Sequence, residues 1–419
     1  MAPSERPAWA ERLRRERRSR LWSQIDMAKE LQEEAKRNKR LHASLPERPS
    51  ILRRIRDYEA GTHQPKDPYR MLYCRVFAID EAELFSDAPS RQELTSADVL
   101  RGILRDSDPF RPIAGRAGPR LGIGDVADLA ARVHGLRLAD DVLAGGDLIK
   151  PAFRELDTAV RIYRTSTYAE VVGRKLLGVI GECAQIAGWV ASDAGEHEQA
   201  SRAYHLGISA AHEAGDRTLE SNLVGSLAYQ VSNIGDPSEA IALTHAAVDM
   251  AGPHAPPRAR ALCWDRVAWA HARVGEAQMT MRALGEAETA LTHHDDEDEP
   301  GYLYWVDAGE LQIMEARSYT ELRRPLRAVP LLTDVLAHYD VTHTRELALY
   351  LSWLAVALAD ANEPEDAAQA ATRMLTMSAD VASDRTAKRV QVVRTRLAPY
   401  SDIPQVRDVL SDPRWSAVG

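Results

Sequence analysis

Three short stretches decide the fold: Ala194-Gly195-Glu196-His197-Glu198-Gln199-Ala200, Ile234-Gly235-Asp236-Pro237-Ser238-Glu239-Ala240 and Val274-Gly275-Glu276. Their glycines are 40 residues apart, and Ala361-Asn362-Glu363-Pro364-Glu365-Asp366-Ala367 repeats the pattern further on. A further copy at residues 323–328 fits if the acidic loop 293–300 is an insertion. Each period accommodates two helices, which bury their apolar faces only by stacking on neighbouring pairs. The sequence therefore predicts an all-α chain that is mostly an α-solenoid of helix pairs.

Small residues recur at two fixed positions of each predicted pair. The first helix carries Gly188, Ala228, Ala268, Ala316 and Ala355, and the second carries Ala200, Ala240, Ala328 and Ala367. Thr280 departs from this alanine pattern. With these residues and turns, the chain from Tyr168 to Met377 resembles the tetratricopeptide repeat family, although its period is longer than usual. The resemblance implies a superhelix whose concave face, lined by the first helix of each pair, binds a ligand.

Alignment of the turn glycines brings aromatic side chains to one inward position. Trp189, Tyr229 and Trp269 occupy it in three successive pairs, and Arg317 and Val356 follow. Further polar candidates for the groove are Glu182, Gln185, Asn222, Asn233, Asp265 and Arg273. These groups suit a peptide backbone, a polar metabolite or a protein effector. Packing between the helices would explain the aromatic residues equally well.

The N-terminal part of the chain is basic, whereas the remainder is acidic. Residues 1–80 hold 19 Lys and Arg against 12 Asp and Glu, and the other residues hold 34 against 50. Such asymmetry is typical of a chain with one end that meets a polyanion. A solvated surface with a chance imbalance is the alternative.

The basic part predicts a small helical domain. Trp9 and Leu13 mark a first helix with a face of arginines, and Ser23 is a typical N-cap for a second helix that buries Ile25, Ala28 and Leu31. Pro49 and Ser50 would cap a third helix, with its apolar face at Ile51, Leu52, Ile55 and Tyr58 and its outer face at Arg53, Arg54 and Arg56. Gly61 would end this helix, and residues 69–85 complete a five-helix core.

These segments resemble the XRE, or lambda-repressor-like, family of helix-turn-helix regulators. The resemblance is carried by Leu13-Arg14-Arg15, Trp22-Ser23-Gln24, Ile55-Arg56-Asp57-Tyr58-Glu59-Ala60-Gly61 and Pro65. It implies that the helix from Ser50 to Glu59 enters the major groove, that Gln24 touches the DNA backbone, and that Thr62 and His63 approach phosphates. Arginine suits this position because its fork reads guanine edges and grips phosphates. The DNA-contacting candidates are therefore Gln24, Ser50, Arg53, Arg54, Arg56, Thr62 and His63.

One departure from that family concerns the connection before the third helix. Thirteen residues, Lys36 to Arg48, stand where such regulators have a tight turn. This connection includes the basic residues Lys36, Arg37, Lys39 and Arg40. They would add phosphate contacts and steepen the salt dependence of DNA binding. The alternative is that they are only the solvated end of a helix.

The domains are predicted as a helix-turn-helix domain at 1–86, a linker at 87–120, a helical connector at 121–170, the repeats at 171–400 and a tail at 401–419. The two connector helices would join at Gly145 and Gly146. Phosphate-loop, zinc, nucleophile and CxxC motifs are absent from the sequence, so we expect no enzyme activity, no cofactor and no metal. The loop from His293 to Glu299 holds possible cation ligands, but adjacent residues on a polar loop are usually solvated. Three dispersed cysteines and the lack of a long apolar run predict a cytoplasmic protein, and the expected DNA binding would make it nucleoid-associated.

Together the two resemblances predict a sequence-specific transcriptional regulator. A homodimer on a two-half-site operator in double-stranded DNA is expected, because one small helix-turn-helix buries too little surface to be specific alone. An effector in the groove would alter the spacing of the two heads. The alternative is a repeat scaffold for protein interactions whose head no longer binds DNA, and a nonspecific nucleoid binder is a further rival.

Overall fold

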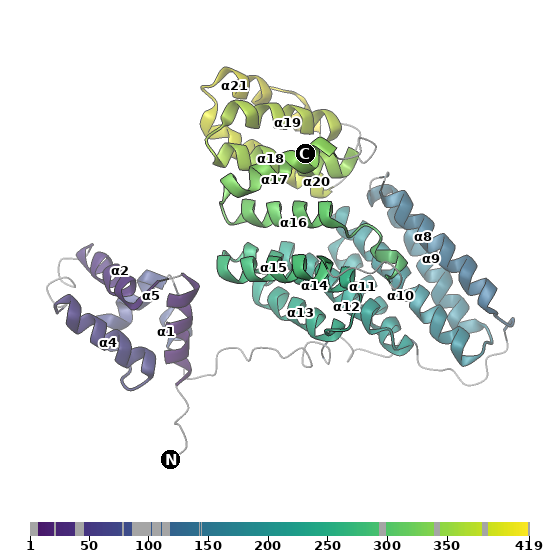
Figure 1. Cartoon of the computed structure of the whole chain (residues 1–419), viewed down its shortest axis with the longest axis horizontal. Coiled ribbons are helices and arrows are strands. Elements are labelled where there is room, and N and C mark those ends of the chain that lie inside the picture. The colour runs from purple at the N-terminus through teal and green to yellow at the C-terminus, as the bar shows by residue number, and fades with distance from the viewer. Residues whose placement is uncertain are drawn as a thin grey trace, which may run out of the picture. The chain divides into compact units, whose positions relative to one another are not determined.

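The chain divides into two compact units, Met1–Leu94 and Thr95–Gly419 (Figure 1). The structure is a computed structural model that describes residues 7–20, 22–37, 46–77, 79–85, 102, 110, 118–141, 143, 145–292, 299–338, 344–378 and 384–417. Within these ranges the regular structure is helical, and none of the described residues lies in a strand. The all-α prediction is thus confirmed. The expected linker at 87–120 falls largely outside the described residues.

The smaller unit is a cluster of short helices. These are α1 (Ala8–Ser19), α2 (Gln24–Lys36), α4 (Arg48–Ala60), α5 (Tyr69–Phe77) and α6 (Glu81–Leu84). Their shared core contains fully buried Leu13, Leu31, Ile55 and Leu72, and Tyr58 packs edge-on against Tyr69 and Tyr73. This core fixes the orientation of α4 because α4 contacts both α1 and α2.

Local signals placed the second helix correctly but misplaced one side chain. Ser23 is the N-cap as predicted, and it forms a capping box with Asp26. The prediction that Ile25 is buried was wrong, because its side chain is 57% exposed. Met27, with Ala28, takes the buried positions instead.

The first helix also differs from its predicted arginine-rich outer face. Arg12 and Arg17 are buried, and the Arg12 Nε donates to the Leu84 carbonyl at 3.1 Å. The guanidinium of Arg20 lies 4.9 Å from the centre of the Phe77 ring. Some of the arginines counted in the basic N-terminal part therefore make contacts within the smaller unit and do not form an exposed basic face.

The larger unit is a succession of helix pairs (Figure 1). The paired helices are α10 (Glu170–Asp193) with α11 (His197–Ala214), α12 (Arg217–Ile234) with α13 (Pro237–Ala251), α14 (Pro257–Arg273) with α15 (Ala277–Thr292), α16 (Ala308–Glu321) with α17 (Pro325–His338), and α18 (Thr344–Asp360) with α19 (Pro364–Ser378). The members of each pair pack together, and the first helices of successive pairs also contact each other. One row of helices, α10, α12, α14, α16 and α18, is thereby continuous.

The turns inside the pairs occur where the repeated motifs predicted them. Four turns have a residue with positive φ: Gly195 (84°), Gly275 (76°), Arg323 (55°) and Asn362 (65°). The turn at Gly235 differs, with φ −112° and ψ −158°. There Asp236 caps α13 by accepting from the backbone N–H groups of Ser238 and Glu239, and Pro237 supplies the first helical residue.

The small residues of the pairs are buried at close helix contacts. A Cβ at Gly188 would lie 2.5 Å from the ring of Tyr204, which is itself 1% exposed. The eight alanines of the predicted pattern and Thr280 are all at most 1% exposed. Thr280 fits because its hydroxyl donates to the carbonyl of Glu276 at 3.1 Å.

Further helices precede and follow the pairs. They are α8 (Ile123–Asp140), α9 (Gly145–Thr165), α20 (Asp384–Leu397), α21 (Pro404–Leu410) and α22 (Arg414–Ala417), with one-turn 3-10 helices η2 (Gly301–Leu303) and η3 (Ala398–Tyr400). Gly145 and Gly146 begin α9 and do not form the predicted joint. Trp415, in the predicted tail, is buried in the core of α16–α21 and its Nε1 donates to the Val409 carbonyl.

The described helices include none that is both long and apolar enough to cross a membrane. Cys183 and Cys263 are buried, Cys74 is half-buried, and all three are free thiols. Burial raises the pKa of Cys183 to about 12 and that of Cys263 to about 11. These two thiols behave as core side chains.

Candidate functional site

A basic helix face and an aromatic pocket

The predicted DNA-reading helix is α4, and its three arginines are exposed. At about 100° per residue, Arg53 and Arg56 are about 60° apart on the side opposite the buried Ile51 and Ile55. Arg54 lies to one side, with its guanidinium 5.1 Å from the centre of the Tyr69 ring. The structure therefore places two arginines on the outermost face, whereas the sequence predicted three.

The start of α4 differs from the prediction. Ser50 is exposed and lies inside the first turn, so the predicted cap at this residue was wrong. Glu47 is the N-cap and makes no side-chain capping bond. Proline is tolerated at Pro49 because backbone N–H groups in the first turn have no helical acceptor.

The end of α4 is as predicted. Gly61 has φ 77°, and the backbone N–H of Thr62 donates to the Asp57 carbonyl at 3.1 Å. The Thr62 hydroxyl donates to the same carbonyl at 2.8 Å. Thr62 and His63 are both exposed, so they are accessible beside the end of the helix.

Gln24 is tied to α4 through a buried carboxylate. Glu59 accepts from Arg17 at 2.5 and 2.8 Å in a two-point ion pair, and the Gln24 Nε2 donates to the same carboxylate at 3.1 Å. The side chains of Arg17 and Glu59 are 9% and 7% exposed. Arg17 also donates to the Trp22 carbonyl at 2.6 Å. This cluster, Arg17, Gln24 and Glu59, holds α1, the start of α2 and the end of α4 together.

The larger unit contains a pocket of about 220 Å³, lined by the row of first helices and by α20. We call it the aromatic pocket and define it by Trp189, Tyr229, Trp269, Arg317, Trp353 and Arg389. One side of the pocket is formed by α20, which reaches the beginning of α11, where Lys388 and His197 approach to 3.4 Å.

Its rings form a continuous wall. Trp189 stacks on Tyr229 with 5.8 Å between centroids, Tyr229 meets Trp269 at 6.2 Å, and Trp353 meets Trp269 edge-on at 5.8 Å. The predicted ladder is therefore a real juxtaposition. In α18 the aligned residue, Val356, does not line the pocket, and Trp353, one turn earlier, completes the wall.

Arginines lie over these rings. The guanidinium carbon of Arg317 is 4.7 Å from the centre of Trp269 and 5.4 Å from that of Trp353, while that of Arg389 is 3.5 Å from Trp353. Arg273, also predicted for this site, lies at the pocket, where it pairs with Glu321 at 3.0 Å. Asn233 lines the pocket too, and its amide donates to the Tyr229 carbonyl at 2.7 Å.

Four other predicted groove residues lie outside the aromatic pocket. Glu182 pairs with Arg137 of α8 at 2.9 Å, and burial raises the pKa of its carboxyl. The Gln185 amide donates to Ser226 at 3.4 Å, and Asn222 is buried beside Arg266 and Cys263. Asp265 is 2% exposed, and burial raises its pKa. These four predicted residues thus lie apart from the six that line the pocket.

Sequence reasoning missed other members of the pocket. Gln230 adjoins the recognised Tyr229, and a search one residue beyond each aromatic would have found it. In α18, Trp353 lies about one turn and Tyr350 about two turns before the aligned Val356. Lys388 and Arg389 belong to α20, which follows the last predicted pair, so no repeat register pointed to them.

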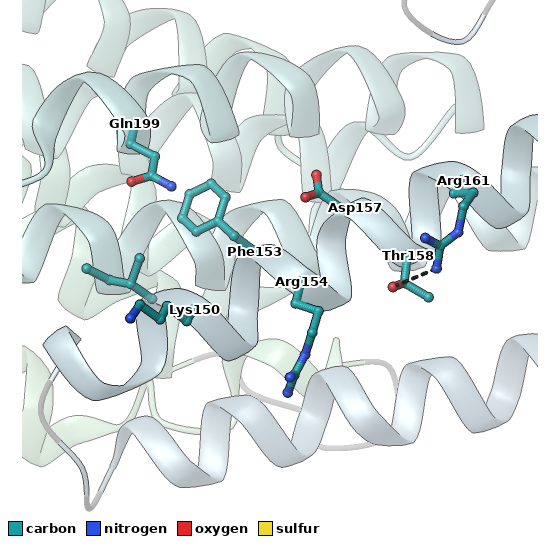
Figure 2. Close-up of a pocket in the computed structure, with 8 residues that line it drawn as sticks. Lys150, Phe153, Arg154, Asp157, Thr158, Arg161 and Gln199 are labelled. Atoms are coloured by element: carbon teal, nitrogen blue, oxygen red, sulfur yellow. Dashed lines mark hydrogen bonds between the residues drawn. The ribbon is translucent and has the colours of Figure 1, made fainter.

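A second, wider hollow of about 440 Å³ lies along α9 (Figure 2). Lys150, Arg154 and Arg161 are distributed over several turns of this helix, and the Arg161 guanidinium donates to Thr158 at 3.3 Å. Arg154 extends away from Phe153 and Gln199 in this view. Because its cations do not converge, this open surface is a weaker ligand site than the aromatic pocket.

The loop with possible cation ligands lies at residues 293–298, outside the described residues. Glu299, at its end, accepts from the backbone N–H of Arg258 at 2.9 Å. In the part of the chain that the structure describes, no group of three or more His, Cys, Asp or Glu side chains is placed to hold a metal.

No protein-family model matches the chain, and a search of the curated proteins finds no match.

Proposed function

We propose that the smaller unit binds double-stranded DNA through α4 and that the larger unit controls this binding as a transcriptional regulator. The observation that carries the proposal is the exposed pair Arg53 and Arg56 on a helix whose inner face is fixed in a core. Two guanidinium groups on one outward face suit guanine edges and phosphates of a major groove.

The cluster of Arg17, Gln24 and Glu59 supports this proposal. A reading helix must be held firmly because small displacements remove hydrogen bonds to bases. Glu59, in the last turn of α4, has a buried carboxylate that accepts hydrogen bonds from Arg17 of α1 and Gln24 of α2. Gln24 keeps part of its surface accessible, so it contacts a DNA phosphate in this proposal while its amide is oriented by Glu59.

In the same proposal, the five helix pairs form a tetratricopeptide-like array. Their turns, their small residues and the continuous row of first helices support this comparison. In this account the array forms the homodimer and binds an effector in the aromatic pocket, and DNA binding changes only if the effector prefers one conformation of the array.

The experiment compares binding of the full chain to genomic promoter fragments and to random DNA at about 150 mM salt, where weak phosphate attraction is screened. We expect preferred fragments, and replacement of Arg53 and Arg56 by alanine should weaken their binding at least tenfold. Arg75→Ala is the matched control, because Arg75 is an exposed arginine of the same unit on α5. Equal binding of all fragments indicates a nonspecific binder, and no binding indicates a protein-interaction scaffold; either result contradicts the proposal.

A further inference from the structure

The aromatic pocket contains cationic groups without a carboxylate partner. Arg317 is 9% exposed, and its Nη2 donates to the Tyr229 hydroxyl at 2.5 Å, but its Nε has no acceptor. Arg389 donates to the hydroxyl and carbonyl of Ser352 at 3.0 and 3.4 Å. Among the described residues, no carboxylate forms an ion pair with either arginine. Burial lowers the pKa of Arg389 to about 9, although the charge of Glu321 raises it.

Two neutral groups of the pocket are also unsatisfied. The indole N–H of Trp269 has no acceptor, and the Oε1 of Gln230 has no donor, although the Gln230 amide donates to the His197 carbonyl at 2.7 Å. Buried polar atoms are nearly always hydrogen-bonded, and each exception needs an explanation. The residues that carry these unsatisfied atoms all line the same cavity.

The aromatic rings account for only part of this arrangement. A guanidinium that lies over a ring face gains a cation–π attraction. That attraction compensates the charge, but it gives no acceptor to the Arg317 Nε or to the Trp269 N–H. A bound anion would place its negative charge beside Arg317 and Arg389, whose guanidiniums share the ring of Trp353.

The size of the pocket restricts the ligand. Small-molecule sites usually have about 300–1,000 Å³, so a cavity of about 220 Å³ suits a compound of one or two rings and is too small for a peptide of several residues. Its walls are flat rings, which favour a flat apolar body by stacking.

We propose that the aromatic pocket binds a small organic anion, a carboxylate carried on a flat hydrophobic ring. The carboxylate accepts from Arg317 and Arg389, and the ring lies against Tyr229, Trp269 and Trp353. Binding itself depends only on the larger unit, whereas a role of this anion as the effector of DNA binding rests on the function proposed above.

The test is calorimetric titration of the full chain, without DNA, with indole-3-acetate and benzoate, and with indole-3-acetamide and benzamide as neutral counterparts of nearly equal shape. We expect at least one acid to bind with one site per chain and a Kd below about 1 mM, and its amide to bind at least tenfold more weakly. Arg317→Met and Arg389→Met should each weaken binding of the acid at least tenfold. Arg161→Met, in the hollow along α9, should leave it unchanged.

The comparison of acid and amide uses the unaltered chain, so it decides the proposal even if an arginine variant fails to fold. The proposal is overturned if neither acid binds below about 1 mM, if the amide binds as tightly as the acid, or if folded arginine variants bind like the unaltered chain. A chain that binds the acid but shows no preference among DNA fragments retains the pocket and loses the function proposed above. Sequence-specific DNA binding without any acid binding shows the reverse.

Discussion

The buried ion pair of the smaller unit offers a quantitative test of how α4 is held. Glu59→Gln keeps the shape of the side chain but removes the negative charge opposite Arg17. Both side chains are more than nine-tenths buried, and breaking a buried pair from one side costs about 3–5 kcal/mol. We therefore expect the smaller unit to lose about that much stability, because Arg17 would stay buried without an anion and Gln24 would lose its carboxylate partner.

Hydrogen exchange measured by mass spectrometry on the full chain reports this loss locally. Peptides from α1, α2 and α4 should exchange about a hundredfold faster or more at their most protected amides. Peptides from the larger unit should be unchanged. Glu81→Gln is the control, because its ion pair with Arg70 is partly exposed and such pairs contribute about 0–1 kcal/mol.

A double replacement separates charge from packing. Arg17→Met with Glu59→Leu removes both charges and should be more protected than Glu59→Gln alone, since no uncompensated ion remains. A change of exchange in α4 that is no larger for Glu59→Gln than for Glu81→Gln would contradict the stabilising role of the buried ion pair.

Two further predictions concern the larger unit. Gly188→Ala should destabilise the chain by about 1–3 kcal/mol in chemical denaturation, because its Cβ would meet the buried ring of Tyr204. Gly285→Ala, at a helix position with open space around it, should instead stabilise the chain by about 0.5–1 kcal/mol. Equal effects of the two substitutions would contradict the close packing at Gly188. Burial raises the pKa of Glu310 to about 7 despite the hydrogen bond from Tyr350, so ionisation of this carboxyl destabilises the folded chain as pH rises from about 4.5 to 7. Relative to the unaltered chain, Glu310→Gln should therefore raise the free energy of unfolding by about 1–3 kcal/mol more at pH 8 than at pH 5. A stabilisation that does not depend on pH would contradict this prediction.

Much of the helical architecture was predictable from local signals. Turn residues such as Gly195 and Gly275, the cap Ser23 and the stop Gly61 act on their immediate neighbours, so their positions in the sequence fix helix ends. The small residues of the pairs were predictable for a related reason. A close helix contact excludes large side chains wherever the repeat returns to it.

The sequence predictions that the structure corrected concern contacts between segments that are far apart in the sequence. Arg17 is buried because Glu59 lies opposite it, 42 residues later, and α1 alone gives no sign of this partner. Trp353 and Arg389 belong to the aromatic pocket because α18 continues the row of first helices and α20 packs against α18. Residue periodicity within one helix says which face is apolar but not which neighbour covers it.

Selection of DNA from a random pool by the full chain tests the central claim most directly. We predict that the chain enriches a defined sequence motif, and that the Arg53→Ala, Arg56→Ala double variant, at the same salt concentration and with the same helix content, fails to enrich it. Selection of no motif by the unaltered chain, or of the same motif by the double variant, would contradict the assignment of α4 as the reading helix.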